Sequence, residues 1–171
     1  MNDQSFMKSL FHGVIAENVI FPYPEPSNGE ADSLNAILEN VRRFCAANVD
    51  SAKIDEEQAI PAAVLEGLKA LGLFGMQIPK ELGGMGLSNT GYARVMQEIS
   101  GIDPSIALTL GGHQSIGIKG LLLFGTDEQK KKYLPRLATG ELVAAFALTE
   151  PSAGSDAAAI QTRADRHPRH N

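Results

Sequence analysis

The segment from Ile106 to Phe124 constrains the fold of this chain more than any other stretch of its sequence. Lys119 is its one charged residue when histidine is counted as neutral, and apolar side chains occur on all sides of the helix that the pattern predicts. Pro104 is well placed to open this helix, because the first helical turn needs no backbone N–H. A helix that is apolar nearly all round is typical of a buried position. The sequence therefore predicts a helix over 105–124 at the buried centre of a helical bundle.

Three other segments repeat apolar residues at helical spacing and end at recognisable helix signals. The first begins at Asp32 or Ser33 as N-cap, and the others cover 61–71 and 88–100. A further helix begins at Thr126, where residues 126–129 form a capping box, and we expect Pro135 to end it. Ahead of these helices, the apolar spacing in residues 4–15 predicts an amphipathic helix for docking. The prolines in residues 21–26 predict an extended tether.

The run from Leu142 to Leu148 is continuously apolar and stops abruptly at Thr149. Such a run followed by turn residues predicts a strand covered on both faces that delivers a binding loop, in which Gly154 allows close approach of a ligand. The alternative is that Thr149 begins a simple strand-ending turn and that 155–156 caps a short alanine-rich helix.

Charge and cysteine content exclude several classes of function. Fifteen Lys and Arg against twenty Asp and Glu give a net charge of −5, which argues against a nucleic-acid surface. Cys45 is the single cysteine, so no internal disulfide forms, and no Cys/His spacing suits a metal; we expect no metal site. We expect no transmembrane segment either, because the most apolar stretch carries His113, Gln114, Lys119 and several glycines.

Residues 146–156, FALTEPSAGSD, are similar to the flavin-binding signature of the acyl-CoA dehydrogenases. Further motifs resemble the same family in order and spacing, up to about Thr162. They lie at residues 73–79, 81–86, 89–94, 112–117 and 125–135. Together with Phe21-Pro22-Tyr23-Pro24, they resemble its very-long-chain branch more than its short- or medium-chain branches.

The resemblance implies a mainly α fold. Residues 1–31 would be an amphipathic helix and tether, and 32–140 the helical N-terminal domain of the family. Residues 141–162 would hold the opening strand and FAD loop of a truncated β domain, and the basic tail 163–171 would be disordered. Without sheet partners, that strand would expose an edge that favours association.

The activity that the resemblance implies is FAD-dependent α,β-dehydrogenation of long or very-long-chain acyl-CoA in fatty acid β-oxidation. Electrons would pass to an electron-transfer flavoprotein, and the complete enzyme would be a homo-oligomer. It would lie in the cytoplasm of a bacterium, or in the mitochondrial matrix or at the inner-membrane face of a eukaryote. We expect the 171-residue chain alone to be inactive. The alternative is a non-catalytic helical interaction module derived from such an enzyme.

The residues expected to line the flavin form one continuous loop, with the Thr149 hydroxyl and backbone groups at the polar edge of its ring system. They are Phe146, Ala147, Leu148, Thr149, Glu150, Pro151, Ser152, Ala153, Gly154 and Ser155. By the same resemblance, Ser155 would also contact the CoA part of the substrate. No catalytic residue is assigned, because the family's base is a glutamate of the C-terminal helical domain, and Glu150 is interpreted as structural.

Ala107 and Gly111 are small residues four positions apart on the apolar helix and so share one face. They could leave room for the distal part of a long acyl chain. Equally, they could let two helices pack closely. His113 and Gln114 are expected to be hydrogen-bonded core groups, and Cys45 an inert core thiol.

Overall fold

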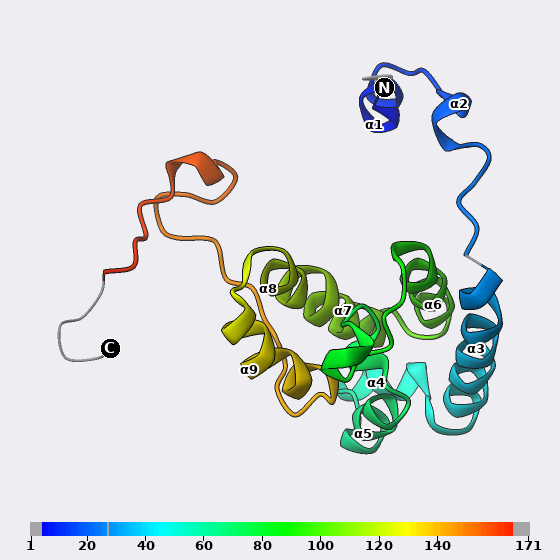
Figure 1. Cartoon of the computed structure of the whole chain (residues 1–171). Coiled ribbons are helices and arrows are strands. Elements are labelled where there is room, and N and C mark those ends of the chain that lie inside the picture. The colour runs from blue at the N-terminus through cyan, green and yellow to red at the C-terminus, as the bar shows by residue number, and fades with distance from the viewer. Residues whose placement is uncertain (1–4, 27, 166–171) are drawn as a thin grey trace.

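The computed structural model describes residues 5–26 and 28–165 and shows a mainly helical chain. Figure 1 shows the longer helices gathered in one bundle, with α1 and α2 at one side of it and the C-terminal segment extending away from α8 and α9. The α-helices are α1 Phe6–Phe11, α2 Glu17–Ile20, α3 Asn28–Asn48, α4 Ser51–Glu57, α5 Ala62–Ala70, α6 Asn89–Ile102, α7 Pro104–Gly111, α8 Lys119–Phe124 and α9 Asp127–Ala138. The other helical turns are η1 Leu73–Gly75, η2 Lys80–Leu82, η3 Gly112–Ile118 and η4 Ala157–Ala159.

The predicted apolar helix is α7, η3 and α8 in direct succession, opened by the Asp103 N-cap and Pro104. Its middle part, η3, is a π-helical turn. One face is buried, with Ile106, Leu110 and Ile118 in the core. The other is exposed: Leu108 and Phe124 keep 77% and 85% of their accessible surface. The prediction of a fully buried central helix is therefore wrong for that face.

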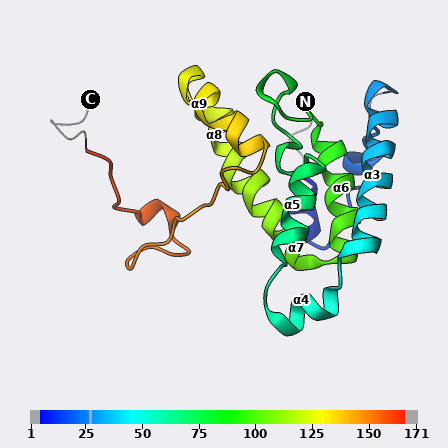
Figure 2. The ribbon, with the colours of Figure 1, turned by 90° about the horizontal axis from the view of Figure 1, so that it is seen from below.

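Two apolar clusters hold the bundle together. The larger joins α3, α5, α6, α7 and η1, with Val41, Leu68 and Phe74 among its buried members. The smaller joins Ile78 and Ile118 to α9, and Leu142 and Ala144 pack against it from the following segment. Figure 2 shows α8 and α9 side by side at one end and α3 and α6 at the other.

Helix ends follow the local signals in most places. The capping box at Thr126 and Gln129 forms as predicted. Pro135, in contrast, lies inside α9, because Leu134, Leu137 and Ala138 pack into the smaller cluster on both sides of it. Helix α3 begins at Asn28, ahead of the predicted caps, and the short α4 was not predicted.

The terminal regions were predicted less well. The expected helix over 4–15 is shorter, ends with α1 and is followed by α2; Phe11 and Ile15 are exposed. Residue 4 and most of the basic tail, from residue 166 on, lie outside the described residues. No helix in the described ranges combines the length and apolarity needed to cross a bilayer.

The predicted buried strand over 142–148 does not form within the part of the chain that the structure describes. The segment is extended, but Val143 and Phe146 each expose 60% of their surface. A strand is defined by ladder hydrogen bonds to a neighbour, and no second extended segment lies beside this one among the described residues. The local pattern was therefore wrong about both the strand and its burial.

Candidate functional site

The loop with the predicted flavin residues contains a tight turn that closes on itself. The Glu150 N–H donates to the Ala153 carbonyl at 3.1 Å, and the Ala153 N–H donates back to the Glu150 carbonyl at 3.0 Å. Pro151 and Ser152 form the tip, and the Ala153 side chain is buried. A turn therefore does form at 150–153, and η4 follows after Asp156 without a side-chain cap, which departs from the capping alternative.

The Glu150 carboxylate holds the two ends of this loop together. It accepts hydrogen bonds from the backbone N–H groups of Gln161, at 2.6 Å, and Thr162, at 3.1 Å, and from the Thr162 hydroxyl. The hydrogen bond from the Thr162 hydroxyl, followed by that from the Gln161 amide, lowers the pKa of Glu150 below its ordinary value. The carboxylate thus stays ionised and acts as a structural clasp.

The other predicted flavin residues stand open to solvent. Phe146, Thr149, Gly154 and Ser155 are exposed, and the structure describes no protein hydrogen-bond partner for the backbone N–H groups of 145–149. An extended backbone with unused donors, apolar side chains and a hydroxyl can hydrogen-bond and cover one side of a planar heterocycle. The donor set therefore fits one wall of a flavin site.

His113 connects this segment to the bundle. The Ala144 N–H donates to its Nδ1 at 2.9 Å, so Nδ1 is the acceptor and the proton lies on Nε2. Nε2 lies 3.1 Å from both the Phe74 and the Leu137 carbonyl oxygens and donates to them. Burial lowers the pKa of His113, against the opposing effect of these two carbonyls, and the ring is neutral.

The neighbouring Gln114 is also a buried polar residue, as predicted. Its Nε2 donates to the Leu73 carbonyl at 2.9 Å. Its Oε1 is buried and has no protein partner within the described ranges. Cys45 lies buried in the larger cluster, and burial raises the pKa of its thiol, so the thiolate that would react is disfavoured.

The two predicted acyl-chain residues lie against α6. Ala107 is buried in the larger cluster. A Cβ added to Gly111 would stand 3.6 Å from the Met96 methyl and 4.0 Å from the Tyr92 hydroxyl, which is ordinary van der Waals contact. These distances suit close packing of α6 and α7 and leave the acyl-chain hypothesis a prediction. Burial raises the pKa of Tyr92.

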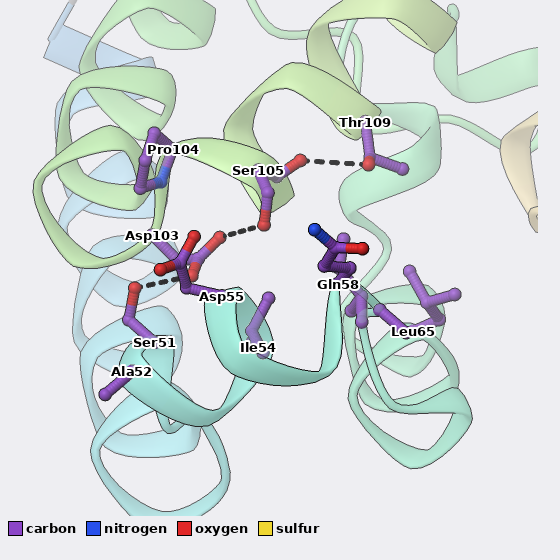
Figure 3. A pocket seen from close by; sticks show the side chains of 12 residues that line it. Ser51, Ala52, Ile54, Asp55, Gln58, Leu65, Asp103, Pro104, Ser105 and Thr109 are labelled. Atoms are coloured by element: carbon purple, nitrogen blue, oxygen red, sulfur yellow. Dashed lines mark hydrogen bonds between the residues drawn. The ribbon is translucent and has the colours of Figure 1, made fainter.

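A surface pocket of about 870 Å³ lies elsewhere, between α4, α5 and the start of α7. Figure 3 shows Asp103 in its wall between Ser51 and Ser105. The buried Asp103 carboxylate accepts from the Ser51 hydroxyl at 2.7 Å, from the Ser105 hydroxyl at 2.5 Å and from the Ile106 N–H at 2.8 Å. None of the predicted site residues lines this pocket.

The Asp103 carboxylate was not anticipated. Burial has the largest single influence and raises its pKa, but the hydrogen bonds from Ser105, Ser51 and the backbone together outweigh it and leave the pKa below its ordinary value. The signal that could have revealed its role is the Asp103-Pro104 pair, an acceptor directly before a helix-opening proline. No group of three His, Cys, Asp or Glu residues suited to a metal occurs in the described part of the chain.

Comparison with known proteins places this arrangement in a family. The model of the acyl-CoA dehydrogenase N-terminal domain matches residues 31–141. The very-long-chain-specific mitochondrial acyl-CoA dehydrogenase of Macaca fascicularis is 50% identical over 166 residues, covering 96% of this chain and 25% of that protein. The chain thus spans about a quarter of the length of such curated relatives.

Solved structures agree with this placement. An acyl-CoA dehydrogenase from Bacillus anthracis, solved in complex with FAD, superposes with a TM-score of 0.63 at 37% identity, over 75% of this chain and 22% of that one. Butyryl-CoA dehydrogenase from Megasphaera elsdenii gives a TM-score of 0.66 at 28% identity, over 81% and 37%. By the domain match and these similarities, the chain belongs to the acyl-CoA dehydrogenase family, whose N-terminal helical domain it contains.

Proposed function

We propose that this chain supplies the N-terminal helical domain and one wall of the flavin site of an FAD-dependent acyl-CoA dehydrogenase. The observation that carries the proposal is the exposed segment 145–149, whose backbone donors have no partner among the described residues, followed by the clasped turn at Glu150. It lies within the FALTEPSAGSD stretch that resembles the family's flavin signature. FAD, when bound, would supply the oxidising power: it would accept a hydride from the β carbon of the acyl thioester, while a base takes the proton from the α carbon.

The residues of this chain would bind and orient the flavin. Backbone N–H groups of 145–149 and the Thr149 hydroxyl would donate to its polar edge, and the exposed Phe146 and Leu148 would cover its apolar surface. Ser155, exposed after the turn, would contact the CoA part of the substrate. The proton-abstracting base would come from another part of the complete enzyme, since Glu150 is committed to the Gln161 and Thr162 amides.

We infer a long or very-long-chain acyl-CoA as the substrate, because relatives that are 50% identical carry very-long-chain specificity in their names. The electron acceptor of the complete enzyme would be an electron-transfer flavoprotein, and the complete enzyme would be a homo-oligomer. It would act in fatty acid β-oxidation, in the mitochondrion of a eukaryote or the cytoplasm of a bacterium.

A chimeric enzyme tests the proposal. Residues 1–165 would replace the matching part of the Macaca fascicularis enzyme, and FAD content and oxidation of palmitoyl-CoA would be measured. We expect a yellow, active chimera and negligible turnover by the 171-residue chain alone. A folded chimera without FAD would contradict the proposal, and so would robust turnover by the chain alone with stoichiometric FAD.

The second candidate is a non-catalytic helical interaction module. The exposed face of α7 to α8, with Leu108, Ile116 and Phe124, favours it, because an apolar helix face of this kind is typical of a covered surface. A chimera that folds but neither binds FAD nor oxidises palmitoyl-CoA would support this second function.

The acyl-chain hypothesis is tested in the same chimera by Gly111→Leu. The larger side chain would extend toward Met96 and Tyr92 and should shorten the preferred acyl chain if this face borders it. The matched control is Gly112→Leu, where an added Cβ meets no heavy atom within 4 Å. An unchanged chain-length preference in Gly111→Leu would exclude the hypothesis.

A further inference from the structure

The segment that carries the predicted flavin loop leaves the helical bundle at Ala144. Two of its backbone N–H groups are held by the bundle: that of Leu142 donates to the Arg136 carbonyl at 3.1 Å, and that of Ala144 donates to His113 Nδ1 at 2.9 Å. Both acceptors belong to the bundle, so both N–H groups face it. From 145 to 149 the structure describes no such bond, which makes Ala144 the last fixed point before the turn at Glu150.

His113 can hold this point because its own position is fixed on the opposite side. Its Nε2 lies 3.1 Å from the carbonyls of Phe74 in η1 and of Leu137 in α9, and its ring packs on the Phe74 ring with centroids 5.1 Å apart. One neutral imidazole thus ties three separate segments together. With Nε2 as the donor, Nδ1 must present its lone pair, and that lone pair faces the Ala144 N–H.

Gly117 supplies the second half of the contact. It lies four residues after His113 in the same π-helical turn. A Cβ added at Gly117 would stand 2.4 Å from the Ala144 Cβ, closer than real Cβ atoms approach, and 3.0 Å from the Ala144 carbonyl carbon, which is a tight contact. The segment therefore reaches His113 only because residue 117 has no side chain.

We propose that His113 and Gly117 form a seat for Ala144 that positions the predicted flavin loop relative to the helical bundle. His113 is the positioning residue, since it touches the backbone that leads to the loop and none of the predicted flavin residues. The relevance to flavin binding rests on the proposed function. The seat itself is a property of this chain and can be measured without any ligand.

The first test compares two glycine substitutions in the same turn by amide hydrogen exchange on the whole 171-residue chain. Gly117→Ala should displace Ala144 and raise the exchange rate of its N–H, relative to that of Leu110 in α7, by about tenfold, the size expected for the loss of one hydrogen bond. Gly112→Ala is the matched control, because an added Cβ there meets nothing within 4 Å. It should leave that ratio unchanged.

The second test separates the two nitrogens of His113. In His113→Gln, the amide NH₂ can still donate toward the Phe74 and Leu137 carbonyls, but the acceptor for Ala144 is lost. In His113→Asn, the side-chain oxygen can take the place of Nδ1, while the donor to the carbonyls is lost. The Ala144 to Leu110 exchange ratio should rise in His113→Gln and stay near the original value in His113→Asn.

Equal ratios in the Gln and Asn variants would overturn the positioning role and leave His113 a core residue only. If either histidine variant does not fold, the glycine pair decides: a Gly117→Ala protein with the original exchange ratio would overturn the seat.

The third test compares the FAD content of the chimera carrying Gly117→Ala with that of the chimera carrying Gly112→Ala. Loss of FAD with Gly117→Ala alone supports the link to the flavin. A chimera that never binds FAD contradicts the proposed function, while the exchange result still stands for the seat.

Discussion

Leu68 in the bundle and Leu148 in the extended segment are the same type of residue in opposite surroundings, although the stretch around Leu148 is the more apolar of the two. Leu68 of α5 is fully buried in the larger cluster, whereas Leu148 keeps 45% of its surface accessible. The bundle closes because each helix satisfies its own backbone groups and buries one face against a neighbour. From residue 145 to 149, the extended segment has no hydrogen-bonded strand partner and no covered face among the residues that the structure describes. An apolar stretch is therefore buried only where another helix or strand packs against it.

The same substitution in both regions gives the largest expected contrast. Leu68→Ala should lower the free energy of unfolding by about 2–5 kcal/mol, because it leaves a cavity in a closed core. Leu148→Ala should change it by less than about 0.5 kcal/mol, since an exposed side chain contributes little packing. Urea denaturation followed by circular dichroism measures both. Similar losses in the two variants would show that the segment is packed in solution.

A smaller effect is expected where the bundle buries a charge. Asp103→Asn should destabilise the chain by about 1 kcal/mol, because an N-cap that also accepts from Ser51 and Ser105 loses its charge-assisted hydrogen bonds. Asp50→Asn is the matched control: Asp50 also caps a helix, α4, but at an exposed site, and asparagine caps nearly as well there.

The Asp103 effect depends on pH in a defined direction. Its pKa is lowered in the folded state, so its contribution to stability is fully present above the ordinary value of about 3.9 and is lost as the pH falls through the lowered pKa. The difference in unfolding free energy between the original protein and Asp103→Asn should therefore shrink on acidification from pH 6 to pH 2. A difference that stays constant over this range would contradict the assignment.

The sequence predicts the bundle well because its signals are local. Helical spacing, the Pro104 start and the Thr126 capping box each act within a few residues, and the structure confirms all three. Helix α4 was missed because its one buried residue, Ile54, gives no repeating apolar pattern. The exposed face of α7 to α8 was not predicted because an apolar composition favours burial but does not identify the helices that would cover each face.

The candidate site shows the same limit. A local motif located the loop, and the site residues remain predictions, but the contacts that shape the loop join distant positions. His113 meets Ala144 across 31 residues, and Glu150 meets Thr162 across 12. No periodicity marks such pairs. The predicted strand was wrong for the related reason that a strand needs a partner supplied by another part of a chain.

The smallest global effect is expected at the clasp of the extended segment. Glu150→Gln should leave the unfolding free energy unchanged, because the carboxylate is exposed and holds only the loop. It should shift the amide resonances of Gln161 and Thr162, whose N–H groups donate to this carboxylate, and speed their exchange. Glu141→Gln, which breaks only the ion pair with Arg136 before the segment leaves the bundle, is the control and should leave both amides unchanged.

Acid should open the clasp in the original protein without unfolding the bundle. The hydrogen bonds from the Thr162 hydroxyl and the Gln161 amide lower the pKa of Glu150, so the clasp persists below the ordinary glutamate value of about 4.3 and is lost as the pH falls through the lowered pKa. The Gln161 and Thr162 resonances should therefore move with a midpoint below that value, and not move with pH in Glu150→Gln. A midpoint at or above it would mean that the carboxylate is free in solution. The loop would then keep the backbone turn at Glu150 and Ala153 but lose the link from the Glu150 side chain to Gln161 and Thr162.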